Sequence, residues 1–178
     1  NELELVRICD EGFGSLEIED VTLRLNNRKL LEGIAAHFGA SEHFVEFITI
    51  LDKLDKVGEE GVFNEWEAKG FKVSKEDFAE LKSISEMDAN RALDSLRNLL
   101  STSENAAAQA GLDELEQLFE MISIRPIKNI AVKLDIFLAR GLGYYTGTIF
   151  EAITKDFPGS ILGGGRYDNL TGVFGLSG

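Results

Sequence analysis

The sequence predicts an α+β fold in which a sheet domain is interrupted by a mainly helical insertion. Apolar and polar residues alternate with period two near both ends of the chain, whereas residues 41–125 show helical periodicity and several N-cap residues. With 178 residues, 44% of them hydrophobic, the chain can bury a substantial core. We therefore expect residues 1–40 and 126–178 to form the sheet domain and residues 41–125 to form the insertion.

The first forty residues predict a helix, a strand and a second helix. Residues 1–13 carry their apolar side chains on an imperfect helical face, and residues 15–27 alternate as a strand does. Residues 27–39 place an apolar stripe on one helical face and end at Gly39, where a helix C-cap glycine belongs.

The middle of the chain predicts helices joined by glycine and serine breaks. Helical periodicity is present in residues 41–57, 61–70, 74–85, 88–100 and 113–123. Ser41, Ser74 and Asp88 each stand where an N-cap could begin a helix, because their side chains can accept a hydrogen bond from a free backbone N–H.

After Pro126 the strand-like pattern returns. Residues 130–139 predict a strand buried on both faces, and residues 147–156 predict its antiparallel neighbour. A third strand is expected within residues 159–175, where it runs into a glycine triplet.

Composition excludes several classes of protein. The net charge of -13 argues against broad, non-specific binding of nucleic acid, and no segment has the length and apolarity of a membrane span or the pattern of a signal peptide. Cys9 has no thiol partner, and with only His37 and His43 no thiolate zinc site can form, so no metal is expected. We expect a cytoplasmic protein.

Candidate site residues gather in the loop before the strand at 147–156. Arg140 can present a fork of donors to a phosphate or carboxylate, and the hydroxyls of Tyr144 and Tyr145 can bind a polar ligand edge. Gly163, Gly164 and Gly165 end the third strand and would let a ligand lie close to the backbone. The residues alone predict a cleft for an anionic and polar ligand.

Each of these residues also has a purely structural interpretation. Arg140 could serve only as an ion-pair partner, and one of the adjacent tyrosines, Tyr144 or Tyr145, could be core while the other is exposed. The sequence GGGRYD lacks the lysine and hydroxyl of a P-loop, so the glycines by themselves do not indicate a nucleotide site.

Two linked motifs, ARGLGYYTGTIFE and GGGRYDNLTGVFG, resemble the histidine-specific motifs of the histidyl-tRNA synthetase family in their order and separation. The segments VTLRLNNRKLLEGIAAHFGA and LDKLDKVGEE are also similar to that family, so the resemblance covers nearly the whole chain. One departure is Gly143, which stands where the family often carries an aspartate.

The resemblance implies part of a class II synthetase catalytic domain, built on an antiparallel sheet, that joins histidine to ATP and passes it to tRNA(His). It implies that Arg140 is catalytic and contacts histidine, that Tyr144, Tyr145 and Tyr167 bind histidine, and that Gly163, Gly164 and Gly165 line the cleft with backbone. ATP with Mg is the expected co-substrate, without a tightly bound cofactor. The full-length enzyme is expected to be a homodimer with no membrane contact, and the insertion to reach toward the tRNA acceptor stem.

The family's dimer-forming motif, its ATP-binding motif and its arginine-bearing third motif have no counterpart in this sequence. We therefore expect an internal fragment that is inactive alone. The alternative is a non-catalytic, synthetase-like regulatory subunit of histidine biosynthesis, which generally lacks a helical insertion. A third interpretation, an acidic helical interaction module, leaves RGLGYYTG unexplained.

Overall fold

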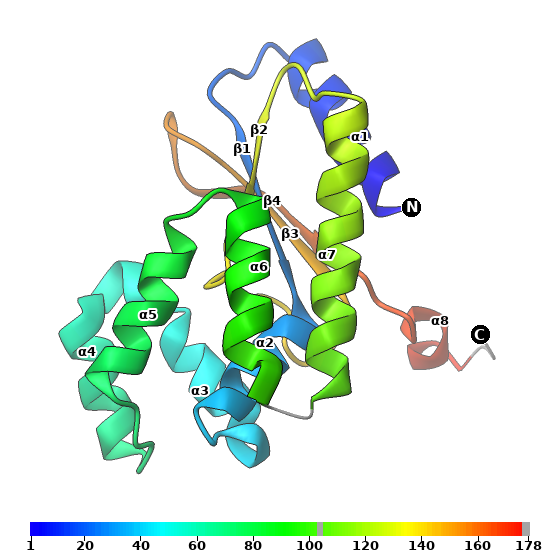
Figure 1. Cartoon of the computed structure of the whole chain (residues 1–178). Coiled ribbons are helices and arrows are strands. Elements are labelled where there is room, and N and C mark those ends of the chain that lie inside the picture. The colour runs from blue at the N-terminus through cyan, green and yellow to red at the C-terminus, as the bar shows by residue number, and fades with distance from the viewer. Residues whose placement is uncertain (103–104, 176–178) are drawn as a thin grey trace.

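The computed structural model describes residues 1–102 and 105–175. At its centre is a four-stranded sheet in the order β2-β1-β3-β4, and helices cover it (Figure 1). The strands are β1 (Thr22–Asn27), β2 (Ala131–Leu134), β3 (Thr148–Thr154) and β4 (Phe157–Gly165). The predicted α+β class is confirmed.

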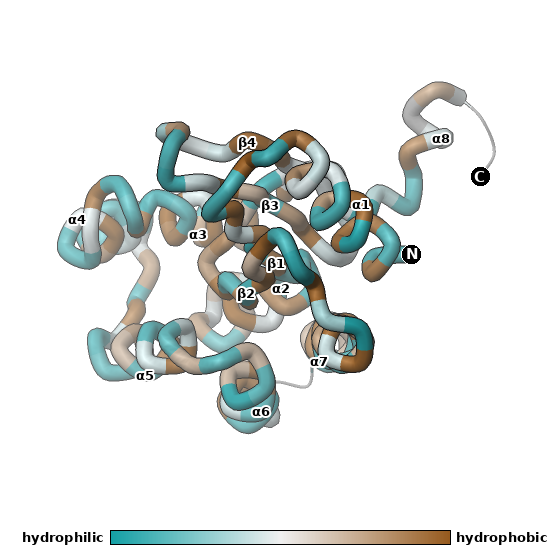
Figure 2. Tube along the Cα trace, turned by 90° about the horizontal axis from the view of Figure 1, so that it is seen from above, coloured by the Kyte–Doolittle hydropathy of each residue, from teal (hydrophilic) through white to brown (hydrophobic). Residues whose placement is uncertain are grey.

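Helices supply the rest of the regular structure within the described residues. They are α1 (Glu2–Ser15), α2 (Arg28–His37), α3 (Phe44–Leu51), α4 (Leu54–Ala68), α5 (Lys75–Ser85), α6 (Ala89–Leu99), α7 (Ala106–Ile124) and α8 (Leu170–Val173), with 3-10 turns at Ser41–His43 and Leu100–Thr102. Viewed from above, the strands follow one another from β4 to β2, and α5, α6 and α7 stand in a row beyond β2 (Figure 2). None of these helices is long and apolar enough to cross a membrane.

The strand pairing differs from the prediction. The segment 130–139 forms only the short β2, which pairs parallel with β1 through Leu23↔Val132, and its residues are alternately exposed and half-buried. The antiparallel neighbours of β3 are β1 and β4. The predicted direct pairing of 130–139 with 147–156 is therefore wrong, and the sheet is mixed, because β1 takes the central place beside β3.

Helix and strand boundaries differ at several places. The strand expected at 15–27 begins only at Thr22, because α1 continues to Ser15 and Glu17 and Asp20 take positive φ angles in the turn that follows. Asp88 caps α6 as predicted by accepting a hydrogen bond from the backbone N–H of Arg91, whereas Ser41 begins a 3-10 turn without a side-chain cap.

The predicted N-cap Ser74 is confirmed, since its hydroxyl accepts from the N–H of Asp77. The expected helix 41–57 divides into α3 and α4, and Gly58 leaves helical geometry with a φ of 70°. The third strand ends at Gly165, and α8 follows a short loop.

Helices of the middle region share their cores with the flanking segments. Phe47 and Trp66, from α3 and α4, pack in one cluster with Leu31 of α2 and Ile149 of β3. A second cluster joins α5, α6 and α7 to α2 and to the loop after β2. A third cluster packs β1 and β3 against α1 and α7. The first two clusters combine residues of α3 to α7 with residues of α2, β3 and the loop after β2, so the middle region packs against the sheet segments.

Candidate functional site

The loop between β2 and β3 carries Arg140 and the adjacent tyrosines, and residues around the end of β1 hold it. Asn26 is fully buried and donates its side-chain amide to the carbonyl of Leu138 over 2.9 Å. Arg28 donates its Nε to the carbonyl of Leu142 over 3.1 Å and its backbone N–H to that of Gly147. Sequence reasoning missed Asn26 and Arg28. The signal was available in the two adjacent asparagines, which are unusual inside a strand.

Tyr144 lies in a turn of the loop before β3, and Tyr145 directly follows that turn. Gly141 takes a φ of 61°, and its carbonyl accepts the N–H of Tyr145 over 2.8 Å. The ring centroids of Tyr144 and Tyr145 are 4.5 Å apart, and those of Tyr144 and Tyr167 are 5.6 Å apart. The structure thus brings the three predicted tyrosines into one cluster, although they come from two separate loops.

Tyr145 is the anchored member of this cluster. Its ring lies over Gly165, where a Cβ would come 2.6 Å from the ring, so only glycine fits there. Tyr145 packs against the core cluster that contains Ile149, whereas Tyr144 is 48% exposed. Burial raises the pKa of the Tyr145 phenol, and the neighbouring Tyr144 raises it further.

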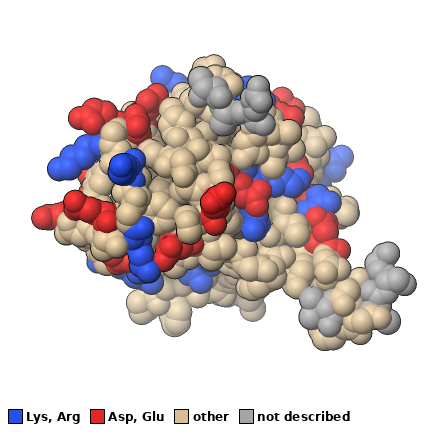
Figure 3. Space-filling view, turned by 90° about the horizontal axis from the view of Figure 1, so that it is seen from below, with Lys and Arg blue, Asp and Glu red and all other residues tan. Residues whose placement is uncertain are grey.

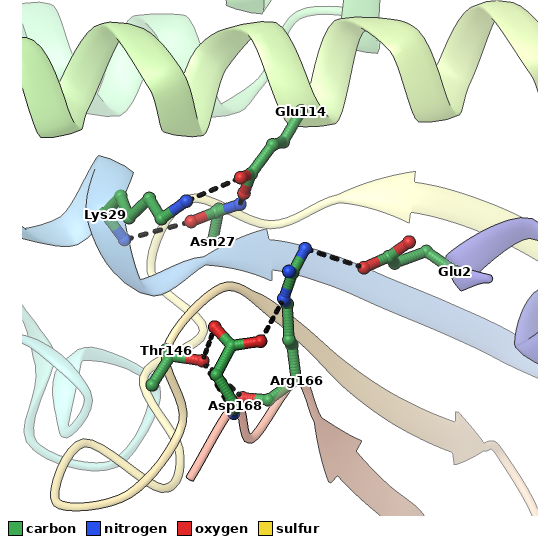
Figure 4. A network of polar contacts seen from close by, with 7 residues as sticks. All are labelled: Glu2, Asn27, Lys29, Glu114, Thr146, Arg166 and Asp168. Carbon is green, nitrogen blue, oxygen red and sulfur yellow. Dashed lines mark hydrogen bonds and ion pairs between the residues drawn. The ribbon is translucent and has the colours of Figure 1, made fainter. Parts of the chain in front are cut away.

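The two motif-bearing loops are joined by backbone and side-chain hydrogen bonds (Figure 4). Thr146 donates its N–H to the carbonyl of Arg166, and Arg166 donates its N–H to that of Thr148, each over 2.8 Å. The Thr146 hydroxyl donates to Asp168 over 2.7 Å, and Arg166 Nε donates to the same carboxylate over 2.8 Å. These two hydrogen bonds, that of Arg166 first, lower the pKa of Asp168.

The same region is connected to the helices around it. Arg166 also pairs with Glu2 of α1 at 3.6 Å. Nearby, Glu114 of α7 accepts a hydrogen bond from Asn27 at 2.7 Å and another from Lys29 at 2.5 Å (Figure 4). Because the Asn27 side chain also caps α2, the last residue of β1 links three elements.

Arg140 precedes Tyr144 and Tyr145 in the same loop. It lines a cleft of about 610 Å³ between the sheet and the α3–α4 region, together with Arg24, Asp135 and Glu151. The residues described as lining this cleft include none of the three tyrosines. Burial raises the pKa of Asp135, and the positive charge of Arg24 at 3.2 Å opposes that rise.

A purely structural role for Arg140 is also supported in this cleft, because Arg140 forms an ion pair with Glu151. The Arg140 side chain is nevertheless 52% exposed. An arginine of this kind can both hold a loop and bind an anion. The binding roles of Arg140 and the tyrosines stay predictions.

The glycine triplet occupies the end of β4. Gly163 and Gly164 face open space, since a Cβ at either position would meet no atom within 4 Å. Gly163 is paired with Glu151 across the strands, so the open space at Gly163 lies beside this cleft residue. Within residues 1–102 and 105–175 no group of three or more His, Cys, Asp or Glu side chains could hold a metal ion.

Cations of the α4–α6 region are mostly paired with acids. Lys69 pairs with Glu46 at 2.7 Å, Arg97 with Asp113 at 2.8 Å, and Lys82 with Glu59. Acidic and basic side chains are interspersed over the face seen in Figure 3. In the part of the chain that the structure describes, Lys72 and Lys75 form no ion pair, and both border a pocket lined by Phe63 and Trp66.

Comparisons with known proteins agree on one family. A family model described as histidyl-tRNA synthetase matches residues 1–177. The chain is 42% identical to the histidine–tRNA ligase of Christiangramia forsetii over 98% of its own length, but it spans only 38% of that protein. It also resembles the crystal structure of histidyl-tRNA synthetase from Nostoc sp. PCC 7120, with a TM-score of 0.84, 32% identity and coverage of 97% of this chain and 41% of that one.

A protein described as an ATP phosphoribosyltransferase regulatory subunit/histidyl-tRNA synthetase, from Bacillus halodurans C, is similar in structure as well. The TM-score is 0.77, and the match covers 98% of this chain and 44% of that one. At 19% identity this likeness shows a shared fold only.

Proposed function

Because the chain belongs to the histidyl-tRNA synthetase family, of class II, we propose that the protein containing it activates histidine with ATP and transfers it to tRNA(His). The observation that carries this proposal is the junction of the two motif-bearing loops. The reciprocal backbone hydrogen bonds between Thr146, Arg166 and Thr148 gather Tyr144, Tyr145 and Tyr167 into one cluster.

In this proposal the tyrosines select the amino acid. Imidazole has one nitrogen that donates and one that accepts, and a phenol hydroxyl can bind either. A pocket that pairs these polar atoms rejects an apolar analogue, because the analogue would leave buried groups without partners. Tyr145 is the stronger candidate, since Gly141 and Gly165 pack against its ring and fix it. Tyr144 and Tyr167 complete the pocket, and Gly163, Gly164 and Gly165 offer backbone to the ligand.

Arg140 acts on the anions. Attack of the histidine carboxylate on the α-phosphate of ATP brings two negative groups together, and a fixed guanidinium reduces their repulsion and stabilises the charge that develops. The half-exposed Arg140 side chain fits a carboxylate or phosphate. The described residues offer no cluster of Mg ligands, so no step is assigned to that ion.

The rest of the proposal follows the family. Residues 1–40 and 126–178 belong to the catalytic domain, and residues 41–125 form an insertion that serves tRNA. The full-length protein is proposed to be a cytoplasmic homodimer. Since the chain spans about 38% of the curated relatives it matches, these properties concern the whole protein.

The test is histidine-dependent exchange of pyrophosphate into ATP by the purified full-length protein, followed by charging of tRNA(His). We expect both activities with histidine and neither with other amino acids. A regulatory subunit that shares only the fold would bind histidine without exchange, and that result would replace the proposal.

A further inference from the structure

Glu151 is a buried charged residue to which the proposed function gives no role. It lies in the middle of β3, and its side chain is only 5% exposed. Its strand neighbours are Arg24 on β1 and Gly163 on β4. Directly paired residues present their side chains on the same face, so Glu151 stands between Arg24 on one side and the open space at Gly163 on the other.

Two arginines converge on this carboxylate. Arg24 Nη1 is 3.7 Å from Oε2, and Arg140 Nε contacts Oε1. The Arg140 contact is an ion pair without hydrogen-bond geometry, and among the described residues Oε1 has no hydrogen-bond partner. A buried ion pair adds little net stability, because desolvation offsets its attraction, so stability alone gives little reason for a charge here.

The contact between Glu151 and Arg140 gives a functional reason for a buried charge at position 151. Its closest contact with Glu151 is through Nε, at the base of the guanidinium, and within residues 1–102 and 105–175 Arg140 makes no hydrogen bond. The terminal amino groups, which form the fork that binds a carboxylate or phosphate, therefore remain available. A carboxylate at the base of the group fixes its direction without occupying its binding end.

Arg24 helps to hold the Glu151 carboxylate in place. Arg24 Nη1 also lies 3.2 Å from Asp135 and 3.9 Å from Asp55, so it connects β1, the loop after β2 and α4 at the floor of the cleft. The Arg24 side chain is only 28% exposed. Glu151 thus has a fixed partner on β1 and a half-exposed partner, Arg140, on the loop.

We propose that Glu151 is a positioning residue for amino-acid activation, which holds the Arg140 guanidinium by its Nε so that the terminal amino groups meet the reacting anions. This inference rests on the proposed function. It assigns Glu151 no contact with substrate, and it predicts that Glu151 acts only through Arg140.

The experiment is a double-mutant cycle in the full-length protein, read by single-turnover formation of histidyl-adenylate and by calorimetric binding of histidine. Glu151→Gln keeps the size of the side chain and removes its charge. It should lower the rate about 10- to 100-fold, the usual effect of misplacing a reacting or stabilising group by about 1 Å, and change histidine affinity only a few-fold. In an Arg140→Ala background the same change should have no further effect.

Glu120→Gln is the matched control, because Glu120 is an exposed residue of α7 remote from the cleft. Thermal unfolding of each variant measures the folded fraction, and rates are compared per folded molecule. If Glu151→Gln does not fold, Glu151→Asp decides in the same cycle, since it keeps the charge and withdraws it from Arg140 by one methylene.

Three results overturn the inference while leaving the proposed function intact. They are a rate equal to that of the control, rate effects of Glu151 and Arg140 that add independently, and a weakened affinity for histidine with an unchanged rate. The last would mean that Glu151 binds substrate itself. Absence of exchange in the wild-type protein would instead reject the proposed function, and the inference with it.

Discussion

Gly111 of α7 lies against the backbone of Leu30 in α2, so closely that a Cβ at position 111 would come 2.8 Å from the Leu30 nitrogen. The two helices also approach each other at Gly33, which packs against Ala108. Helix α7, the last of the middle region, therefore packs closely against α2. Deleting residues 41–125 as a block would uncover the buried faces of α2, so the insertion is better tested by surface substitutions.

Gly111→Ala should destabilise the protein. Adding a methyl group to this contact forces α2 and α7 apart, and overpacking of this kind costs about 1–3 kcal/mol, more than the gain in helix propensity. Gly12→Ala in α1 is the control, because a Cβ there meets no atom within 4 Å and should stabilise the helix by about 0.5–1 kcal/mol. Denaturant unfolding measures both, and equal effects would contradict the tight contact.

Arg140→Ala should slow activation far more than it weakens histidine binding. Loss of one preorganised donor to the developing charge typically costs about 3 kcal/mol of transition-state stabilisation, or more than about 100-fold in rate. Single-turnover adenylate formation and histidine binding are measured on the same preparation. An unchanged rate would leave Arg140 with the structural role that its ion pair with Glu151 already supplies.

Tyr145 should lose its proton at higher pH than an ordinary tyrosine. Burial first, and Tyr144 second, raise its pKa above the usual value of about 10. Between that value and the raised pKa the folded state keeps a proton that the unfolded chain has released, so stability falls as pH rises through this window. Phenolate absorbance should show that Tyr145→Phe removes a component that titrates above pH 10 and that Tyr144→Phe shifts this component to lower pH. If Tyr145→Phe instead removed a component that titrates at or below pH 10, the prediction of a raised pKa would be wrong.

Lys72→Glu with Lys75→Glu should reduce transfer of histidine to tRNA while leaving pyrophosphate exchange intact. These two lysines have no ion pair within the described residues, whereas Lys69, Lys82 and Arg97 are already paired with acids. Reversing free cations weakens phosphate contacts and makes the remaining binding less dependent on salt. The matched control is Arg125→Glu with Lys128→Glu, both exposed beyond the end of α7. Equal losses in the two double variants would point to net charge rather than to a tRNA surface.

Much of the local structure could be predicted from the sequence. Ser74 and Asp88 cap their helices as their residue type and position indicate, and Gly39 follows α2 with a φ of 69°. These features depend on residues a few positions apart, so a short stretch of sequence contains their whole cause. For the same reason the glycines and tyrosines of the two motifs could be identified as candidates before their positions were known.

The sheet order and the geometry of the site were decided by tertiary structure. Asn26 holds a loop 112 residues away in sequence, β1 lies between β2 and β3, and Arg140 pairs with Glu151 of β3. Such contacts arise from competition among many segments to bury apolar surface and pair backbone groups, which no local pattern records. The sequence by itself determined which residues carry chemistry and which stretches form helices; only the folded chain determined which of them meet, because that depends on burial and pairing over the whole molecule.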